Sequence, residues 1–281
     1  MTNEKTLLME IFQPFAQYRN PFTFYYAQTY PLPPKSTIIG MLQNAVGDWY
    51  GNKYGIERWW SLKVSVHAGF ESVFWSYQSL IKGELDLTED GVLINRHNKN
   101  PGGNVWLPLY VEGLTSQRSP VYQQELFNGH LSLFIRGENE IIDEIKSALE
   151  KLNKSLFLGR SEDIIFIRKV TRIEPDRKID DVKGDLKLNY PTYLSDKIPI
   201  KNKKYPIYYI PVKVIFKNNN ENVKHKSEIT KSTKRETFFQ QVIYTGYDYS
   251  IILDENTSVD LEVYKINENK EIRVVSPYGW L

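Results

Sequence analysis

No cysteine occurs among the 281 residues of the chain, which excludes disulfides and thiolate metal sites. Hydrophobic runs are also short. None approaches the roughly 18–20 residues that span a bilayer, and the N-terminal segment lacks the pattern of a secretory leader. These absences favour a cytoplasmic protein that makes no membrane contact.

Histidine is scarce, with four residues, and none of them lies in an HxH or HExxH pattern. We therefore expect no zinc site, and nothing in the sequence requires a cofactor. A metal-independent ribonuclease would need only an acid–base set around a 2′-hydroxyl, which His97 or His130 with a nearby Tyr or Lys could supply. Because the sequence does not bring these groups together, cleavage stays an alternative to simple binding.

Excess charge is small, because 36 Lys and Arg stand against 34 Asp and Glu. Proteins that coat DNA indiscriminately are usually strongly basic, so the balance argues against that class but leaves room for a local basic groove. Aromatic residues are abundant instead, with 19 Tyr, 13 Phe and 6 Trp. Rings of this kind either fill a β-sheet core or stack on the unpaired bases of single-stranded RNA.

Apolar periodicity predicts an α+β fold. A strand is expected at 7–12, a helix at 37–50 and an irregular region with an inserted hairpin at 51–118. Asn128-Gly129 is the preferred two-residue turn, which predicts a hairpin over 119–136. A helix capped by Asn139 and a strand at 164–171 follow. The order β, α, insertion, β-turn-β, α, β is that of a ferredoxin-like unit, the order also found in RNA-recognition modules.

The pattern of residues 174–281 differs from that of the N-terminal part and predicts a smaller β-rich region. Strands are expected at 205–216, 237–253, 259–266 and 271–276, with a hydrophilic loop at 217–236. The predicted organisation is therefore a domain at 1–173 and a second, β-rich domain at 174–281.

The segment from Pro31 to Thr37 combines a proline-rich turn with the start of the first helix. Prolines keep the chain extended up to Pro34, and the hydroxyl of Ser36 or Thr37 is expected to cap the helix. The helix start beside Lys35 would welcome an anion such as an RNA phosphate. Glycines that cradle phosphates in a P-loop are absent, so a nucleotide triphosphatase is not expected. The plain alternative for Lys35 is a solvated charge.

Three further segments join basic, aromatic or glycine residues. Tyr18-Arg19 follows the first strand within an aromatic loop, and Arg19 is the better candidate for a ligand contact. Gly159-Arg160-Ser161 lies between a helix and a strand. The segment either binds a phosphate or is simply the turn by which the chain leaves the helix. The polar run that contains Arg96, His97 and Lys99 is either the tip of a finger or a surface loop.

The sequence resembles the Cas-five family of CRISPR-associated proteins, within the RAMP superfamily. The matching residues are the first strand followed by Ala16-Gln17-Tyr18-Arg19, the block from Tyr30 to Gly47, the segment 119–137, and Leu156–Asp163 with its Leu-Gly-Arg. Together they cover most of residues 7–172. The wide insertion resembles the type I-B branch more than the type I-E branch.

This resemblance implies an RNA-binding subunit of a Cascade surveillance complex in antiviral defence. Such proteins cap the 5′ handle of the crRNA and contact a Cas-seven-type backbone subunit and a Cas-eight-type large subunit, so that target DNA is met only indirectly. It also implies a ferredoxin-like RAMP domain with a long thumb, assigned to about 70–118. The expected RNA contacts are Tyr18, Arg19, Lys35, Ser36, Thr37, Arg96, His97, Lys99, Gly159, Arg160 and Ser161.

No catalytic residue, metal ligand or cofactor is assigned. Two alternatives stay open beside the binding subunit: a metal-independent endoribonuclease that processes pre-crRNA, as in the type I-C branch of the same family, and a purely structural interaction module.

Overall fold

The computed structural model describes residues 4–23, 26–81, 85–87, 93–95, 118–201, 205–218, 221–230, 232–246 and 250–281. The helices are α1 (Lys35–Val46), α2 (Ile56–Ser61) and α3 (Asn139–Glu150), with 3-10 turns η1 (Trp49–Gly51) and η3 (Lys226–Glu228). The first seven strands in the larger N-terminal part are β1 (Glu4–Ala16), β2 (Tyr26–Ala27), β3 (Lys63–Ile81), β4 (Leu85–Leu87), β5 (Leu93–Asn95), β6 (Arg118–Glu138) and β7 (Leu156–Phe157).

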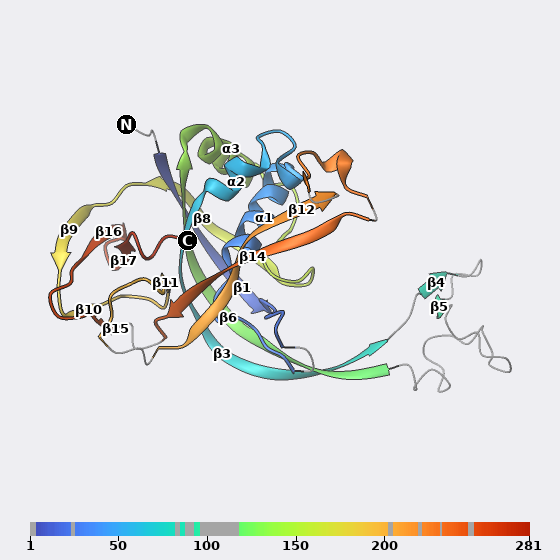
Figure 1. Cartoon of the computed structure of the whole chain (residues 1–281), viewed down its shortest axis with the longest axis horizontal. Coiled ribbons are helices and arrows are strands. Elements are labelled where there is room, and N and C mark those ends of the chain that lie inside the picture. The colour runs from blue at the N-terminus through green and yellow to red at the C-terminus, as the bar shows by residue number, and fades with distance from the viewer. Residues whose placement is uncertain are drawn as a thin grey trace.

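The remaining strands are β8 (Ile164–Ile173), β9 (Arg177–Val182), β10 (Asp185–Lys187), β11 (Tyr193–Ser195), β12 (Ile207–Asn218), β13 (Glu221–Asn222), β14 (Lys234–Tyr244), β15 (Ser250–Ile252), β16 (Val259–Asn267) and β17 (Lys270–Ser276). Strands thus outnumber helices, and the long ones curl around the helices (Figure 1). The predicted α+β class is confirmed in this coarse sense.

Strand β1 forms the middle of the central sheet, because it pairs antiparallel with β6 on one side and with β8 on the other. Its side chains alternate between two apolar cores. Leu7, Met9 and Ile11 enter the main core with the helices, whereas Leu8 points to the opposite face and packs with Phe134 and strands β16 and β17. Burial on both faces explains why this segment is strongly apolar.

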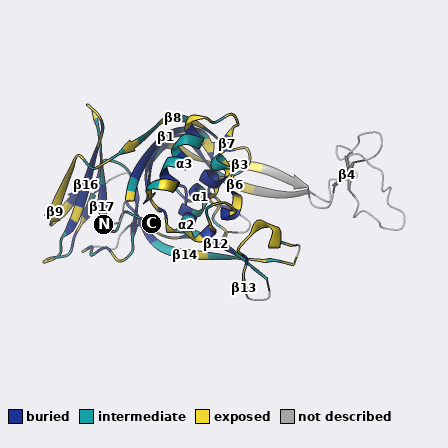
Figure 2. Cartoon of the chain, turned by 90° about the horizontal axis from the view of Figure 1, so that it is seen from above, coloured by how far each residue is buried: buried dark blue, intermediate teal, exposed yellow. Residues whose placement is uncertain are grey.

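Strands β3 and β6 form a long antiparallel ribbon on the outer edge of that sheet. Their pairing runs without a break in register from Lys63–Arg136 to Ile81–Arg118. One end lies in the sheet beside β1, and the other end leaves the body of the molecule (Figures 1 and 2). The spatial order of the four long strands is therefore β8-β1-β6-β3.

The predicted hairpin with an Asn128-Gly129 turn is wrong, because both residues lie inside the continuous strand β6. Asn128 does have a positive φ of 54°, and it falls between the cross-strand pairs Gln13–Gly129 and Phe15–Phe127. A Cβ at Gly129 would lie 2.2 Å from the ring of Phe70. The dipeptide therefore kinks the strand and admits a ring from β3, rather than reversing the chain.

Helices α1 and α3 cover one face of the central sheet. Buried side chains of both helices join the main core, among them Ile38 and Leu42 of α1 and Ile141 and Ile145 of α3. The predicted caps are wrong: α1 begins at Lys35 after Pro34, α3 begins at Asn139, and neither N-terminus has a side-chain cap. Proline suits the entry to α1 because its φ is fixed and it offers no amide donor that would need a partner.

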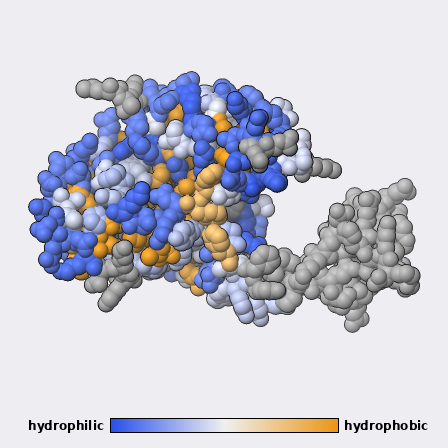
Figure 3. Space-filling model, in the orientation of Figure 1, coloured by the Kyte–Doolittle hydropathy of each residue, from blue (hydrophilic) through white to orange (hydrophobic). Residues whose placement is uncertain are grey.

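The C-terminal strands pack on both sides of this unit. Strand β12 lies against α1, and Ile210 of β12 and Val242 and Tyr244 of β14 belong to the main core. Strands β9, β16 and β17 form a second sheet whose Tyr264 and Val274 cover the other face. A further small core joins β10, β15 and their neighbours. The surface in Figure 3 is largely hydrophilic, with hydrophobic residues gathered in a band across its middle.

Several C-terminal strands lie close to where the sequence predicts them, including β12, β16 and β17. The segment 217–236 is more ordered than the predicted hydrophilic loop, because it contains β13, η3 and the start of β14. The domain boundary near residue 174 stays a prediction.

Candidate nucleic-acid interface

The glycine loop, residues 157–163, connects β7 to β8 near the end of β1. Gly159 has a φ of 120°, and a Cβ there would lie 2.6 Å from an oxygen of Asp163 and 2.9 Å from the carbonyl oxygen of Gln17. The loop thus needs glycine at this position for two reasons, its backbone conformation and the close approach of β1.

Arg160 folds back over this loop and binds carboxylates of the protein itself. Its Nη2 donates to Asp163 Oδ1 at 2.8 Å, its Nη1 lies 3.3 Å from Glu125 Oε1, and its Nε lies 3.3 Å from Glu162 Oε1. Burial opposes the charge, but the hydrogen bonds and attraction of Asp163 and Glu125 outweigh it and raise the pKa of Arg160. The guanidinium therefore stabilises the loop.

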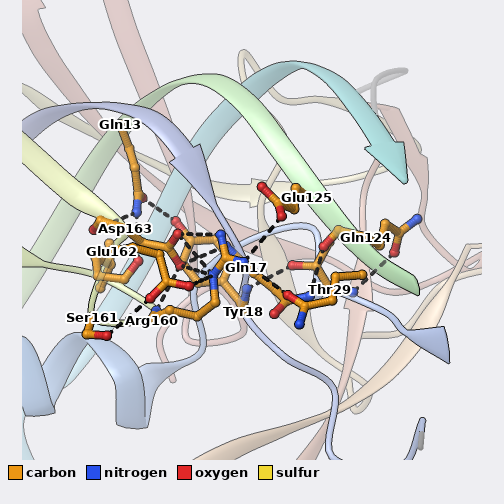
Figure 4. Close-up of polar contacts among 12 residues, drawn as sticks. Gln13, Gln17, Tyr18, Thr29, Gln124, Glu125, Arg160, Ser161, Glu162 and Asp163 are labelled. Atoms are coloured by element: carbon orange, nitrogen blue, oxygen red, sulfur yellow. Dashed lines mark hydrogen bonds and ion pairs between the residues drawn. The ribbon is translucent and has the colours of Figure 1, made fainter. Parts of the chain in front are cut away.

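Asp163 is the centre of this network, which is drawn in Figure 4. Its side chain is fully buried, and its Oδ2 accepts from the backbone amides of Gln17 at 3.0 Å and Arg160 at 2.8 Å. Gln13 Nε2 donates to the carbonyl oxygen of Leu158 at 2.7 Å. The end of β1 and the glycine loop are thus held together by charge-assisted hydrogen bonds.

Tyr18 also serves the interior. Its ring is 2% exposed, its hydroxyl donates to Gln13 Oε1 at 2.6 Å, and its amide donates to Thr29 Oγ1. Burial, followed by the nearby charge of Asp163, raises the pKa of Tyr18. A ring enclosed in this way offers no exposed face for stacking, and the expectation that Tyr18 contacts RNA stays a prediction.

Lys35 is likewise enclosed, although the sequence suggested a solvated or phosphate-binding charge. It is 9% exposed, and its Nζ donates to the carbonyl oxygen of Trp60 at 3.2 Å. Burial and, to a lesser extent, the charge of Lys213 lower its pKa to about 8. Its neighbours Ser36 and Thr37 are half-buried on the first turn of α1.

The other predicted contacts divide into exposed residues and residues outside the described part of the chain. Arg19 is exposed beside the bridge that it forms with Thr29, and Ser161 is exposed with its hydroxyl donating to Glu162. Arg96, His97 and Lys99 lie outside the described residues. The structure therefore gathers Tyr18, Gly159 and Arg160 around the end of β1, and it places Lys35 elsewhere, at the start of α1.

A group of exposed rings lies where the ribbon of β3 and β6 leaves the body, and the sequence analysis missed most of it. We call it the arm cluster; it consists of Tyr26, Trp75, Tyr77 and Tyr122. The four rings are between 47 and 61% exposed. Tyr122 contacts Tyr26 at 6.0 Å and Tyr77 at 5.4 Å between ring centroids, and Trp75 meets Tyr26 edge-on at 6.2 Å. Exposed apolar surface of this kind makes the arm cluster a candidate binding site.

The arm cluster also has a structural reason for its position. Strand β2 pairs with β6 through Tyr26–Tyr122, while Tyr77 of β3 stands opposite Tyr122 on the other side. Three neighbouring strands therefore bring tyrosines to adjacent places. In the sequence, Tyr26 belongs to the aromatic loop after the first strand and Tyr122 to the matching segment 119–137, while Trp75 and Tyr77 fall inside the region read as irregular.

His67 is fully buried, which together with the charge of Lys270 lowers its pKa to about 3. Its Nε2 lies 3.0 Å from Ser65 Oγ. Across the described ranges, no three side chains of His, Cys, Asp and Glu gather as metal ligands. The helices within those ranges are also too short or too polar to cross a membrane.

Three solved structures illustrate what the fold resembles. A chain of a CRISPR RNA-guided surveillance complex is 14% identical with a TM-score of 0.48, covering 88% of this chain and 90% of that one. A CRISPR protein from Archaeoglobus fulgidus is 11% identical with a TM-score of 0.41, covering 95% and 97%. A chain of the type III-B Cmr-beta complex bound to cognate target RNA and AMPPnP is 14% identical with a TM-score of 0.37, covering 89% and 86%. Scores below 0.5 do not establish a common fold by themselves.

Sequence comparison is more decisive. No curated protein sequence matches the chain. However, the family model described as CRISPR-associated protein (Cas_Cas5) matches residues 6–248, which is well over half of the chain. The chain therefore belongs to the Cas5 family of CRISPR-associated proteins.

Proposed function

We propose that the protein is an RNA-binding subunit of a type I CRISPR Cascade complex. It holds the 5′ handle of the crRNA and joins a Cas-seven-type backbone subunit to a Cas-eight-type large subunit, so that target DNA is reached through the complex. The arm cluster carries this proposal, because four adjacent exposed rings can stack on splayed bases. Each stacked base contributes about 1–3 kcal/mol.

The proposal includes an organisation of the chain. Residues 1–173 form a ferredoxin-like RAMP domain, a view supported by the strand order β8-β1-β6-β3 and by the helices that follow β1 and β6. The ribbon of β3 and β6 forms the base of a thumb that spans about 70–118, and the strands after 174 form a second, β-rich domain. The subtype, type I-B, is proposed on resemblance alone.

Individual residues take different roles in this proposal. Arg19 is exposed and binds a phosphate, while Ser36, Thr37, Gly159 and Ser161 offer backbone or hydroxyl donors at the surface. Arg96, His97 and Lys99 contact RNA from the thumb. Tyr18, Lys35 and Arg160 hold the loops and helix that carry these donors, since their own side chains bind protein groups.

The direct test is handle-RNA binding by the full chain, measured by fluorescence anisotropy at fixed salt. Replacing Trp75 by Leu removes a ring that is 48% exposed while keeping an apolar side chain on β3. We expect Trp75→Leu to weaken binding by roughly 5- to 100-fold, the loss of one stacked base. A matched control is Phe238→Leu, which removes a ring of similar exposure, 42%, from β14.

An equal loss of RNA affinity in both variants would show a general effect of removing exposed rings. That result would contradict a specific role of the arm cluster in RNA binding. Unchanged affinity in Trp75→Leu would favour a purely structural interaction module. Incubating the wild-type protein with repeat RNA in EDTA addresses the remaining alternative, since discrete cleavage products would identify a metal-independent endoribonuclease instead.

A further inference from the structure

The face of the central sheet opposite α1 and α3 carries a second group of aromatic side chains. Alternation along the strands defines this face, because Ile11 of β1, Leu131 of β6 and Ile165 of β8 all enter the main core with the helices. The residues next to them, Phe12, His130 and Phe166, must therefore point the other way. Strands β16 and β17 cover the same face around Leu8 and Phe134, and Lys270 of β17 reaches Glu10 and Ser132 beside them.

These three rings touch one another and remain accessible. The centroids of Phe12 and His130 lie 5.2 Å apart, and Phe12 and Phe166 are nearly parallel at 6.1 Å. Phe166 is 45% exposed, and His130 is exposed as well. Three neighbouring strands, β6, β1 and β8, thus supply one ring each to a continuous platform.

A cation lies over this platform. The guanidinium carbon of Arg168 is 5.3 Å from the centroid of the Phe12 ring, and the side chain is exposed. Among the described residues, no carboxylate lies within ion-pair distance of Arg168, in contrast to Arg160 with its three carboxylates. An unpaired positive charge beside stacked rings complements a phosphate that follows a stacked base.

A second trio continues the aromatic surface along β1. Ala16 and Leu126 belong to the main core, so the adjacent Phe15 and Phe127 point to the face opposite the helices. Phe15 lies 5.3 Å from Phe127 and 6.3 Å from Phe74, centroid to centroid, and is 46% exposed. The side-chain-free Gly129 separates the two trios along β6. We call the two trios with Arg168 the aromatic track.

We propose that the aromatic track binds unpaired bases of single-stranded RNA by stacking, independently of the arm cluster. The proposal rests on the proposed RNA-binding function and adds a second surface to it. RNA fits the track better than a protein partner does, because each trio consists of rings and a guanidinium lies over the Phe12 ring. RNA-recognition modules of the same strand order carry their stacking rings on this face of the sheet.

The test compares single-stranded RNA of unrelated sequence with handle RNA, both bound to the full chain. Phe166→Leu should weaken binding of the unrelated single strand by roughly 5- to 100-fold, and Phe15→Leu should act similarly, whereas the control Phe238→Leu stays within about twofold. Binding to a duplex of the same sequence should not change, because paired bases cannot stack on the rings. Melting curves establish that the variants are folded.

The outcomes separate this proposal from the proposed function. If Phe166→Leu and Phe15→Leu bind every RNA as the wild type does while Trp75→Leu loses handle RNA, the track is overturned and the handle function stands. If the wild type shows no preference for handle RNA but loses single-strand binding in Phe166→Leu, the track stands and the handle function fails. Should Phe166→Leu not fold, crosslinking of 4-thiouridine RNA to the wild type replaces it, and an absence of crosslinks on β1, β6 and β8 overturns the track.

Discussion

The glycine loop and the arm cluster are two regions of one RNA-binding candidate, and they use their surfaces in opposite ways. In the glycine loop the charges are satisfied internally, since Asp163 is fully buried and Arg160 is 18% exposed. In the arm cluster the rings contact one another but stay about half exposed. The first region satisfies its own charges, whereas the second leaves apolar surface exposed.

This difference bears on the expectation that basic residues mark the RNA site. Arg160 and Lys35 are both basic and both stand in blocks that resemble the family, yet their side chains bind Asp163 and the carbonyl oxygen of Trp60. Tyr122 and Trp75 carry no charge. Tyr122 lies within the matching segment 119–137, and Trp75 lies outside the matching segments. Exposed apolar surface, rather than charge, distinguishes the arm cluster as the candidate interface.

The largest expected effect is a loss of stability when the buried network of the glycine loop is disrupted. Asp163→Ala leaves the guanidinium of Arg160 and two backbone amides without their buried acceptor, so we expect the free energy of unfolding to fall by about 3–5 kcal/mol. Urea unfolding measures it. The control Glu162→Ala removes an exposed carboxylate and should change stability by less than about 0.5 kcal/mol. A fall of equal size in both variants would contradict the buried network.

The second effect is a loss of RNA affinity when rings of the arm cluster are replaced. The double variant Trp75→Leu with Tyr122→Leu should lose roughly 30-fold or more in affinity for handle RNA, because two stacking rings disappear. Stability should change little, because both rings are about half exposed. Anisotropy titration and urea unfolding of the same samples measure both quantities. Lost stability with retained affinity would show that the arm cluster stabilises the fold and does not bind RNA.

The third effect concerns Lys35, whose pKa of about 8 lies below its ordinary value of 10.5. Below pH 8 the lysine is charged in both folded and unfolded protein, so the cost of burying the charge is fully present. Between pH 8 and 10.5 the folded form loses its proton first, and the cost declines. Lys35→Met should therefore stabilise the protein by about 1–2 kcal/mol at pH 7, less its lost hydrogen bond to Trp60.

Unfolding at pH 7 and pH 10 checks this prediction. The stabilisation by Lys35→Met should shrink at the higher pH, while Lys151→Met, at an exposed position, should show no such trend. If Lys35→Met keeps the stability of the wild type but loses RNA affinity, the result would support the phosphate contact that the sequence suggested for Lys35.

The smallest effect belongs to Arg19. A single exposed phosphate contact changes affinity little, but it contributes to the dependence on salt. Arg19→Ala should reduce the slope of log affinity against log salt by about 0.7. Titrations at several salt concentrations measure the slope, and Lys151→Ala serves as the exposed control. An unchanged slope would remove Arg19 from the interface.

The fold could be predicted from the sequence where alternation is strong and local. The segments 7–12, 164–171 and 259–266 alternate, and each lies within a strand of the structure. The full ribbon could not be predicted, because Gly69, Glu71 and Ser72 interrupt the apolar pattern of β3 and its partner β6 lies far away in the chain. Asn128-Gly129 misled the prediction because the same dipeptide that reverses a chain also kinks a long strand.

The candidate site was predictable only in part for the same reason. Gly159 and the loop around it were identified, but the partners of Arg160 include Glu125, which no local pattern connects to it. The arm cluster joins β2, β3 and β6, and its members become neighbours only when those strands pair. Sequence located residues of the right types, whereas tertiary pairing decided which of them remain free to bind.

The most direct measurement maps RNA contacts on the native complex. RNA carrying 4-thiouridine is incorporated into the complex in place of the guide transcript, and the complex is irradiated. The crosslinked peptides of this chain are then identified by mass spectrometry. Handle nucleotides should crosslink to the peptides that contain Trp75 and Tyr122. Crosslinks from the handle that fall only on the glycine loop, or a complex that retains no guide RNA, would contradict the account.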